Sequence, residues 1–466
     1  MRDGAQIRRR LECARMARRG GQHVSIIGAG PCGLACAREL QRLGRDDWLV
    51  YERAGVPGGK AASETDPAGF TWDQGGHVVF SHFGEFDRLL AEVLGDDVHE
   101  HERSSYVRVG DRWVPYPFQN NLRYLAPDDA FACLVGLVEA EGGAPDQDFA
   151  TWMERTFGEG ITRLFMRPYN LKVWAIPASA MASDWIAERV SVVDYRRALH
   201  NVVHGVDDVA WGPNNTFKFP RTGGTGEIYR RVAEPLTPRV RYRSELVGID
   251  VGRRTLRFAD GAAGEYEVLV STMPIDQLIA AIDDCPADVS EAAAALEHNG
   301  VRVVGVGCER QLSDDRSWLY FADEDVPFYR VTNFAKYAAA NVPSADTARY
   351  SSYLTETAYS RHRPGDPGRL EQDVLDGLVT TGLLDETVPI ASVHTINVDY
   401  AYPIPTRGRD HALAVIQPWL AAHDIHSRGR FGSWRYEIGN MDHAVKMGVD
   451  VARRLTEGRP EELWSS

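Results

Sequence analysis

The sequence predicts an α/β fold organised around a dinucleotide-binding βαβ unit close to the N-terminus. An apolar run at 24–27 is followed at once by a Gly-x-Gly-x-x-Gly turn at 28–33 and by helix-forming residues. A second apolar run, 48–51, ends on Glu52, about 20 residues beyond the turn, which is the spacing of this unit. The glycines let the backbone approach a pyrophosphate, the helix N-terminus offers it N–H groups, and Glu52 is expected to bind a ribose. The cofactor-binding residues predicted here are Gly28, Gly30, Pro31, Gly33 and Glu52.

Length and composition narrow the class of protein. A chain of 466 residues indicates two or three domains. The net charge of −14 argues against a nucleic-acid partner, and no apolar run approaches the roughly 18 residues of a membrane span. The six cysteines form no Cys-x-x-Cys pair and no His/Cys cluster has metal-ligand spacing, so we expect reduced thiols, a cytoplasmic protein and no metal. Residues 1–21 are basic and expected to be disordered rather than a secretory signal.

Two further glycine turns indicate which dinucleotide is bound. Gly58-Gly59 follows the βαβ unit, and a strand–turn–strand pattern at 70–80 is centred on Gly75-Gly76-His77. A nicotinamide dehydrogenase would continue as a parallel α/β wrap, which this chain does not do. The order resembles the glutathione-reductase-type Rossmann folds, in which the first glycine turn holds FAD. The apolar segment 266–274 fits a matching third strand, although it fits an ordinary core strand equally well.

The remaining segments predict two inserted domains. Residues 127–205 are mostly helical by pattern, and 301–335 and 350–400 alternate short β-rich runs that predict an antiparallel sheet. We therefore expect an FAD-binding domain formed by 22–104, 221–275 and 425–458, a helical substrate domain at 105–213, and an antiparallel-sheet substrate domain formed by 214–220 and 276–424.

Tyrosines, tryptophans and arginines stand in short dense groups outside the βαβ unit. Singly, each aromatic residue is more simply explained as part of the core. Together they suit a ligand with a flat base, a diphosphate and a sugar, because rings stack on the base and guanidinium groups bind phosphate. The groups are 116–121, 165–174, 318–320, 328–330, 400–403 and the pair Arg430 and Tyr436.

Four of the motifs closely resemble the UDP-galactopyranose mutases of the eukaryotic type. They are 75–82, 113–121, 165–174 and 428–440, and the likeness runs in the same order over about 22–455. The resemblance implies FAD that is active when reduced, NAD(P)H as reductant, and isomerisation of UDP-galactopyranose to UDP-galactofuranose without net redox change. In that family, N5 of the reduced flavin attacks the anomeric carbon and the nucleoside diphosphate leaves, so the protein mainly supplies position and electrostatics.

The same resemblance assigns roles to individual residues. Gly76, His77, Arg330, Arg430 and Asn214 match positions around the reacting atoms. The diphosphate is expected to contact Arg189, Arg330, Tyr320, Tyr402 and Tyr436, the nucleoside Tyr116, Phe118, Gln119, Phe165, Asn170 and Trp174, and the sugar Trp318, Asn214 and Arg430. The flavin is further expected to contact Gly58, Gly59, Gly75, Gly76, His77, Arg103, Val247, Gly429, Tyr436, Asn440 and Met441. Asn440 precedes the last helix, whose positive end would stabilise negative charge on the reduced flavin.

Departures from the family pattern leave alternatives open. Met441 stands where the family more often has glutamine. The loop after Tyr337 is shorter than in the family, which leaves open whether the protein is a monomer or a homo-oligomer. Gln119 favours uracil, but a GDP-sugar or a 6-deoxy-sugar fits the same chemistry. A flavin amine oxidase or desaturase is a weaker alternative, and a flavoprotein that binds nucleotide sugar without turnover is a third.

Overall fold

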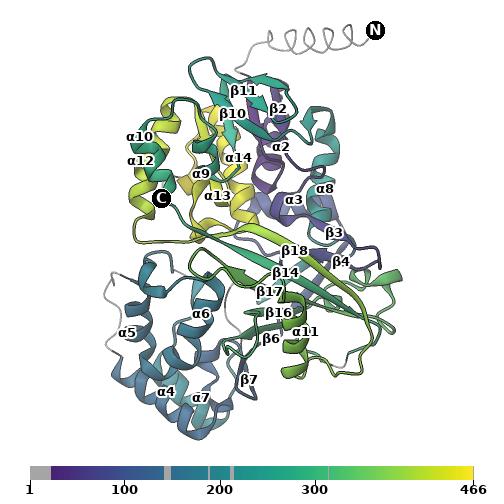
Figure 1. The fold of residues 1–466 in the computed structure, drawn as a ribbon, viewed down its shortest axis with the longest axis vertical. Helices are drawn as coiled ribbons and strands as arrows, with labels where there is room; N and C mark the ends of the chain where they lie inside the picture. The colour runs from purple at the N-terminus through teal and green to yellow at the C-terminus, as the bar shows by residue number, and fades with distance from the viewer. Residues whose placement is uncertain are drawn as a thin grey trace.

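The computed structural model describes residues 23–140, 148–186, 189–209, 212, 215–312 and 314–464. Figure 1 shows three parts: an α/β part that contains both described ends of the chain, a helical part at the opposite end, and a β-sheet between them. The basic segment 1–21 and Asn214 lie outside the described residues. In the part of the chain that is described, no helix combines the length and apolar content needed to cross a bilayer.

The α/β part is built on a five-stranded parallel sheet in the order β19-β13-β1-β2-β9. The predicted βαβ unit and flavin-type α/β fold are confirmed: β1 and β2 pair in parallel and α2 connects them. Residues from four distant parts of the sequence complete the sheet, because its strands are too short and apolar to be stable alone. The strands are β1 (Val24–Ile27), β2 (Trp48–Tyr51), β9 (Val240–Arg241), β13 (Val268–Ser271) and β19 (Ile425–Ser427).

Helices and a small antiparallel sheet cover the parallel sheet. One layer contains α2 (Pro31–Arg42), α3 (Gly84–Leu94), α8 (Gly226–Ala233) and α14 (Met441–Glu457), which share an apolar core with the sheet. The other contains α9 (Ile275–Ala280), α10 (Ala287–Ala294), α12 (Arg409–Ala422) and α13 (Arg430–Ser433), together with β10 (Leu246–Asp250), β11 (Thr255–Phe258) and β12 (Ala263–Glu265).

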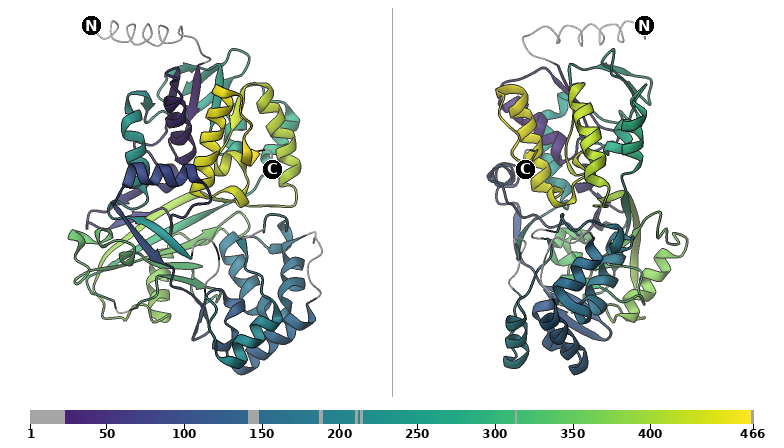
Figure 2. Two further views of the ribbon diagram at one scale, coloured as in Figure 1. Left: turned by 180° about the vertical axis from the view of Figure 1, so that it is seen from behind. Right: turned by 90° about the vertical axis from the view of Figure 1, so that its left-hand side faces the viewer.

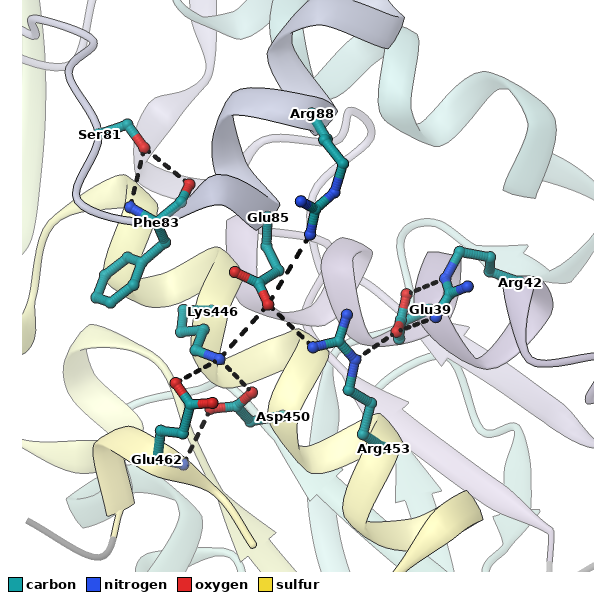
Figure 3. Close-up of polar contacts among 10 residues, drawn as sticks. All are labelled: Glu39, Arg42, Ser81, Phe83, Glu85, Arg88, Lys446, Asp450, Arg453 and Glu462. Carbon is teal, nitrogen blue, oxygen red and sulfur yellow. Dashed lines mark hydrogen bonds and ion pairs between the residues drawn. The ribbon is translucent and has the colours of Figure 1, made fainter. Parts of the chain in front are cut away.

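The first and last helices of this part, α2 and α14, lie side by side, as Figure 2 shows from behind. They approach closely because Gly448 has no side chain: a Cβ there would lie 2.1 Å from the carbonyl oxygen of Cys32. Ion pairs then connect the two helices to α3. Arg453 donates to Glu39 (2.7 Å) and Glu85 (2.9 Å), and Lys446 pairs with Asp450 at 2.9 Å (Figure 3).

The middle sheet has seven strands in the order β18-β14-β17-β16-β15-β6-β7 and is antiparallel except between β15 and β6. The predicted antiparallel sheet is therefore observed, with α11 (Leu370–Thr380) packed against one face. Its strands are β6 (Ser105–Val109), β7 (Arg112–Pro115), β14 (His298–Cys308), β15 (Trp318–Phe321), β16 (Arg330–Asn333), β17 (Ser351–Tyr359) and β18 (Ile390–Pro403).

The helical part contains α4 (Pro127–Glu139), α5 (Phe149–Ile161), a π-helical turn (Thr162–Met166), α6 (Arg167–Trp174) and α7 (Tyr195–His204). Three predicted boundaries need correction. Strands β6 and β7, assigned to the helical domain, join the seven-stranded sheet because β6 pairs with β15. Strand β8 (Thr216–Pro220), assigned to the antiparallel-sheet domain, pairs with β5 (Val98–Glu102). Helices α9, α10 and α12 pack on the α/β part. A separate ladder joins β3 (Ser63–Thr65) and β4 (Thr71–Asp73).

Candidate functional site

The glycine turn after β1 has the shape of a cradle for a pyrophosphate. Gly28 has φ +101°, and a Cβ at Gly33 would lie 1.9 Å from the carbonyl oxygen of Gly28. The second turn touches the first, since a Cβ at Gly59 would lie 3.1 Å from Cα of Gly30. Only glycine fits at these positions. Either the backbone is in the left-handed region, or the backbone of a neighbouring turn fills the space that a side chain would need. The N–H groups of Gly28 and Gly58 donate to the carbonyl oxygens of Tyr51 and Ala29, so the cradle offers a ligand the N-terminus of α2 rather than these two groups.

Glu52 connects the glycine turn to the end of β2. Its carboxylate accepts hydrogen bonds from the N–H of Ala29 (2.6 Å) and of Ala54 (2.8 Å), and the side chain is buried. The N–H of Ser244 donates to the carbonyl oxygen of Glu52 at 2.8 Å. Val247, a predicted cofactor contact, lies just beyond Ser244 on β10 and is 52% exposed. It therefore belongs to the neighbourhood of Glu52, where the adenosine is expected, and does not line the main cavity.

A cavity of about 330 Å³ lies where the three parts of the fold meet. Most of the predicted site residues line it, although they come from segments up to several hundred positions apart. The predicted residues on its wall are Gly75, Gly76, His77, Arg103, Tyr116, Gln119, Phe165, Asn170, Trp174, Arg189, Trp318, Tyr320, Arg330, Tyr402, Arg430, Tyr436, Asn440 and Met441. Gly429 precedes α13 beside this wall, with φ +81°. Phe118 is fully buried behind Phe165, with ring centroids 5.0 Å apart, and does not reach the cavity.

The turn Gly75–His77 forms the floor of the cavity on the side of the glycine cradle. Gly75 has φ +137°, and a Cβ at Gly76 would lie 2.5 Å from Oγ1 of Thr332. The N–H of Gly76 donates to Glu356 at 2.8 Å, which fixes the turn against β17. Glu356 was not predicted from the sequence. Its one signal is a lone carboxylate within an otherwise apolar and hydroxylated strand, 351–359.

His77 is neutral at ordinary pH. Burial lowers the pKa of His77 to about 4, although a quarter of the side chain remains exposed on the cavity wall. Beneath it, burial raises the pKa of the Asp73 carboxyl to about 7. Asp73 accepts hydrogen bonds from the N–H (3.2 Å) and Oγ1 (2.9 Å) of Thr225, at the start of α8, and lies 3.9 Å from Nδ1 of His77. The histidine thus lies beside a carboxyl that is about half ionised at neutral pH.

Four arginines line the cavity, and three of them, Arg189, Arg330 and Arg430, differ in the groups that accept their hydrogen bonds. Arg330 forms a two-pronged ion pair with Glu356, at 2.6 Å for each bond. Arg189 donates to Oδ1 of Asn440 (2.9 Å) and to the carbonyl oxygen of Glu437 (2.5 Å). Arg430 donates to the carbonyl oxygens of Gly439 (2.7 Å) and Ala401 (3.1 Å). Burial lowers the pKa of Arg430, and no carboxylate among the described residues pairs with it.

Lys60, which was not predicted from the sequence, adds a further basic group to the cavity wall. Burial, reinforced by Arg53 and Arg430, lowers the pKa of Lys60 to about 7. Its Nζ lies 5.5 Å above the ring of Phe431, on the cavity wall next to the second glycine turn. Four arginines and Lys60 line this cavity, and the carboxylate of Glu356 neutralises only one of them, Arg330, so the cavity suits an anionic ligand.

Aromatic rings form the wall that the helical part contributes. Phe165 and Tyr169 stack with centroids 5.1 Å apart, and Trp174 meets Tyr436 edge-on at 4.8 Å. Tyr116 approaches Tyr320 at 5.2 Å. Such faces bind planar bases and sugar rings by stacking. Tyr169 and Trp185 line the cavity too and were not predicted individually.

Two polar atoms on this wall lack partners in the described structure. Nε2 of Gln119 donates to the carbonyl oxygen of Ser191, which leaves Oε1 of Gln119 buried without a hydrogen bond. Nε1 of Trp318 is likewise unpartnered among the described residues. A buried unmet donor or acceptor costs about 1–3 kcal/mol, so these two atoms are suited to a ligand. They offer it one acceptor and one donor.

The N-terminus of α14 completes the site. Met441 is the first residue of this helix and Asn440 precedes it, so the positive end of the helix dipole points to the cavity. The next residues form a cluster of two histidines and a carboxylate that spacing along the sequence did not indicate. Nδ1 of His82 lies 2.7 Å and Nδ1 of His443 lies 3.0 Å from the two oxygens of Asp442. These contacts are hydrogen bonds within the cluster, which the fold assembles from segments far apart in the sequence.

Comparisons with known proteins agree with this geometry. A family profile described as flavin containing amine oxidoreductase matches residues 31–455. A crystal structure of reduced UDP-galactopyranose mutase matches with a TM-score of 0.91 and 37% identity, over 94% of this chain and 95% of that chain. Cyclohexylamine oxidase from Brevibacterium oxydans matches with a TM-score of 0.65 and 16% identity, over 94% and 99% of the two chains, which indicates a shared fold. A 15-cis-phytoene desaturase from Synechococcus elongatus is 38% identical over 74 residues, which are 16% of this chain and only 15% of the desaturase.

Proposed function

The chain belongs to the flavin-containing amine oxidoreductases and, among them, to the UDP-galactopyranose mutases, and we propose that it converts UDP-galactopyranose to UDP-galactofuranose. The enzyme is therefore an isomerase, and its cofactor is FAD. The sugar and the nucleotide on which it acts are part of what we propose. The observation that carries it is the cavity: stacked aromatic rings, Arg189, Arg330 and Arg430 surround the space next to the Gly75–His77 turn. An amine or lipid substrate would instead require an apolar channel.

The fit to FAD rests on the two glycine turns. A Cβ at Gly33 or Gly59 would press against the backbone of Gly28 or Gly30, so glycine lets the two turns pack together at the start of α2, and Lys60 adds a basic group beside them. When bound and reduced, FAD supplies N5 as the nucleophile that displaces the nucleoside diphosphate from the anomeric carbon. The absence of a side chain at Gly76 lets this turn pack directly against Thr332 and Glu356, which holds it at the floor of the cavity.

The arginines are proposed to hold the diphosphate before, during and after it leaves the sugar. In a buried cavity their electrostatic attraction is stronger than in water, so the departed diphosphate stays in place to be recaptured. Arg189, bonded to Asn440, and Arg430, bonded to Gly439, are already oriented by the segment that precedes α14. Neutral His77 adds no charge that would compete for the diphosphate. Asn214 keeps its proposed role near the sugar.

Oε1 of Gln119 supports uracil as the base. An unmet amide oxygen accepts a hydrogen bond from N3–H of uracil, and Phe165 and Tyr169 offer a stacking face beside it. NADPH or NADH is proposed as the reductant, because the isomerisation itself supplies no electrons to an oxidised flavin. The described cysteines are free thiols, which supports the cytoplasm as its compartment.

The test is to incubate the dithionite-reduced protein with UDP-galactopyranose, other UDP- and GDP-hexopyranoses and a 6-deoxy analogue, and to separate pyranose from furanose products. We expect furanose from UDP-galactopyranose with reduced enzyme and none with oxidised enzyme. Furanose from a GDP- or 6-deoxy-sugar alone would keep the chemistry and change the substrate. Oxygen-dependent oxidation of an amine or lipid, with no furanose from any sugar, would overturn the proposal.

A further inference from the structure

Exposed apolar side chains gather on two helices of the helical part. Among the residues that the structure describes, ten large apolar side chains are exposed, and seven of them lie between positions 131 and 209. Helices α4 and α7 contact each other at the end of the molecule furthest from the α/β part (Figure 1). Single exposed apolar residues are ordinary, whereas a group of them marks an interaction surface. The seven are Phe131, Val138, Val192, Leu199, Val203, Val206 and Val209.

Helix α4 has apolar residues on two opposite faces. Its inner face consists of Ala130, Cys133, Gly136 and Leu137, all of them buried. A Cβ at Gly160 of α5 would lie 2.6 Å from the backbone nitrogen of Cys133, so close packing fixes the rotation of α4. Phe131, Val135 and Val138 form a second stripe on the other face, where Phe131 is 69% and Val138 is 62% exposed. A helix that is apolar on both sides is typical of one that is covered on both.

Helix α7 is likewise held by one face and apolar on the other. Ala198 and Asn201 are buried, and Nδ2 of Asn201 donates to the carbonyl oxygen of Asn120 at 3.0 Å. Leu199 and Val203 lie one turn apart, and they are 44% and 69% exposed. The inner hydrogen bond fixes the helix, so this exposure is a property of the fold.

The charges beside the two apolar stripes have opposite signs. Helix α4 carries Asp128 in its first turn and Glu139 at its last position, and α7 carries Arg196 and His200; all four residues are exposed. A surface with one acidic and one basic helix complements a second copy of itself, because a two-fold axis can place each α4 against the other copy's α7. A membrane is a poorer partner, since anionic lipid headgroups would repel the acidic helix.

We propose that α4 and α7 form the interface of a homodimer, in which α4 of each copy packs against α7 of the other across a two-fold axis. The apolar stripes form the buried centre of this interface, and the charged residues form its rim. Four helices then share one core, as in a four-helix bundle. The interface lies away from the cavity between the three parts of the fold, and it does not depend on which nucleotide sugar the cavity binds.

The first measurement is the mass of the unaltered, full-length holoenzyme by sedimentation equilibrium over a range of protein concentrations. We expect twice the mass of the chain at micromolar concentration and dissociation on dilution. The mass of a single chain at every concentration would overturn the proposal. Vesicles of phosphatidylcholine, with and without phosphatidylserine, test the other partner: a monomer that binds them and forms no dimer would overturn it as well.

Two substitutions test the apolar centre of the interface. Phe131→Asp and Val203→Asp place a charge where the second copy is expected, and each should raise the dissociation constant of the dimer by at least about 30-fold. Ile390→Asp is the matched control, because Ile390 is 40% exposed on β18, outside this surface. It should change the dissociation constant by less than about twofold. Dimers that persist unchanged in both interface variants would refute the proposal.

Charge reversal tests which helix faces which. Asp128→Lys with Glu139→Lys makes both helices basic, and Arg196→Glu with His200→Glu makes both acidic. Each double variant alone should dimerise at least about tenfold more weakly, because like charges then face each other. An equimolar mixture of the two should form heterodimers, since each α4 then meets an α7 of opposite charge.

Undiminished dimers of either charge variant, or a mixture that fails to associate, would contradict the pairing of α4 with α7. Flavin content and circular dichroism show whether each variant is folded holoenzyme. If the variants do not fold, the mass of the unaltered enzyme decides between dimer and monomer.

Discussion

The guanidinium of Arg189 donates to Oδ1 of Asn440 at 2.9 Å, across 251 positions of sequence. This bond joins the segment before α7 to the residue that precedes α14, so a cavity arginine and a predicted flavin contact are positioned together. A change at either residue is expected to affect both ligands.

Arg189→Ala should weaken binding of UDP and disturb the flavin at once. Loss of a charged hydrogen-bonding group costs about 1.5–3 kcal/mol, which corresponds to roughly 10- to 150-fold in affinity. The measurement is UDP titration of the holoenzyme, with the flavin absorption spectrum recorded in parallel. Arg163→Ala, which removes an exposed partner of Asp129, is the control and should stay within about twofold. Unchanged UDP affinity in Arg189→Ala would remove this residue from the site.

Gly76→Ala should abolish turnover while the protein still binds FAD. The added Cβ would lie 2.5 Å from Oγ1 of Thr332, so the turn must move, whereas the glycine cradle at 28–33 is untouched. We expect at least about a 100-fold loss of the turnover rate, or roughly 3 kcal/mol. Combining it with Thr332→Ala should restore part of the activity. Gly408→Ala, which meets nothing within 4 Å, is the matched control. Full activity of Gly76→Ala would contradict the packing argument.

Gln119→Leu should reduce the preference for uracil. The substitution removes the unpartnered Oε1 and the donor to Ser191 while keeping a similar volume. A lost hydrogen bond to the base is worth about 1 kcal/mol or more, so UDP should bind roughly 5- to 30-fold more weakly. Asn120→Leu at the neighbouring position, whose amide donates to Asp208, controls for local damage. Competition between UDP and GDP measures the outcome, and an unaltered UDP/GDP ratio would argue against base recognition by Gln119.

Lys60→Met should stabilise the apoprotein most at low pH. Burial lowers the pKa of Lys60 to about 7 from the ordinary 10.5, so the folded state disfavours the proton that the unfolded chain retains. This unfavourable contribution is fully present below pH 7 and fades as pH rises towards 10.5, because both states are then neutral. The Tm of Lys60→Met should exceed that of the parent at pH 6.5 and approach it by pH 9.5. Added FAD should narrow the gap at pH 6.5, since the pyrophosphate would compensate the lysine. A difference in Tm that is independent of pH would contradict the assignment.

The parts of the fold that local pattern determines could be predicted from the sequence. The glycine turn at 28–33 and Glu52 depend on residues within about 30 positions of one another, so spacing alone identifies them. Glu356, Lys60 and the cluster of His82, Asp442 and His443 could not be found this way. Their environment comes from strands and turns hundreds of residues away, and nothing adjacent in sequence distinguishes them from ordinary charged residues.

The predicted domain boundaries differ from those in the structure for the same physical reason. A short turn separates strand β6 from β7, and in the sequence this pattern predicts an isolated hairpin before the helical segment. Its other edge pairs with β15, more than 200 positions later, and this pairing places it in the seven-stranded sheet. Residues of short dense motifs could be predicted to share one site, and most of them line one cavity, because a ligand site gathers several polar aromatics and arginines from one segment.

The contact between Gly448 and Cys32 has a consequence for biosynthesis. Strand β19 and helix α14 are made long after β1 and α2, yet the parallel sheet needs the first and α2 packs against the second. During translation, α2 emerges with its apolar face uncovered and has to wait for more than 400 residues of chain. FAD can therefore be retained only after α14 has been made, and chains that stop before α14 should accumulate as flavin-free targets for chaperones and proteases.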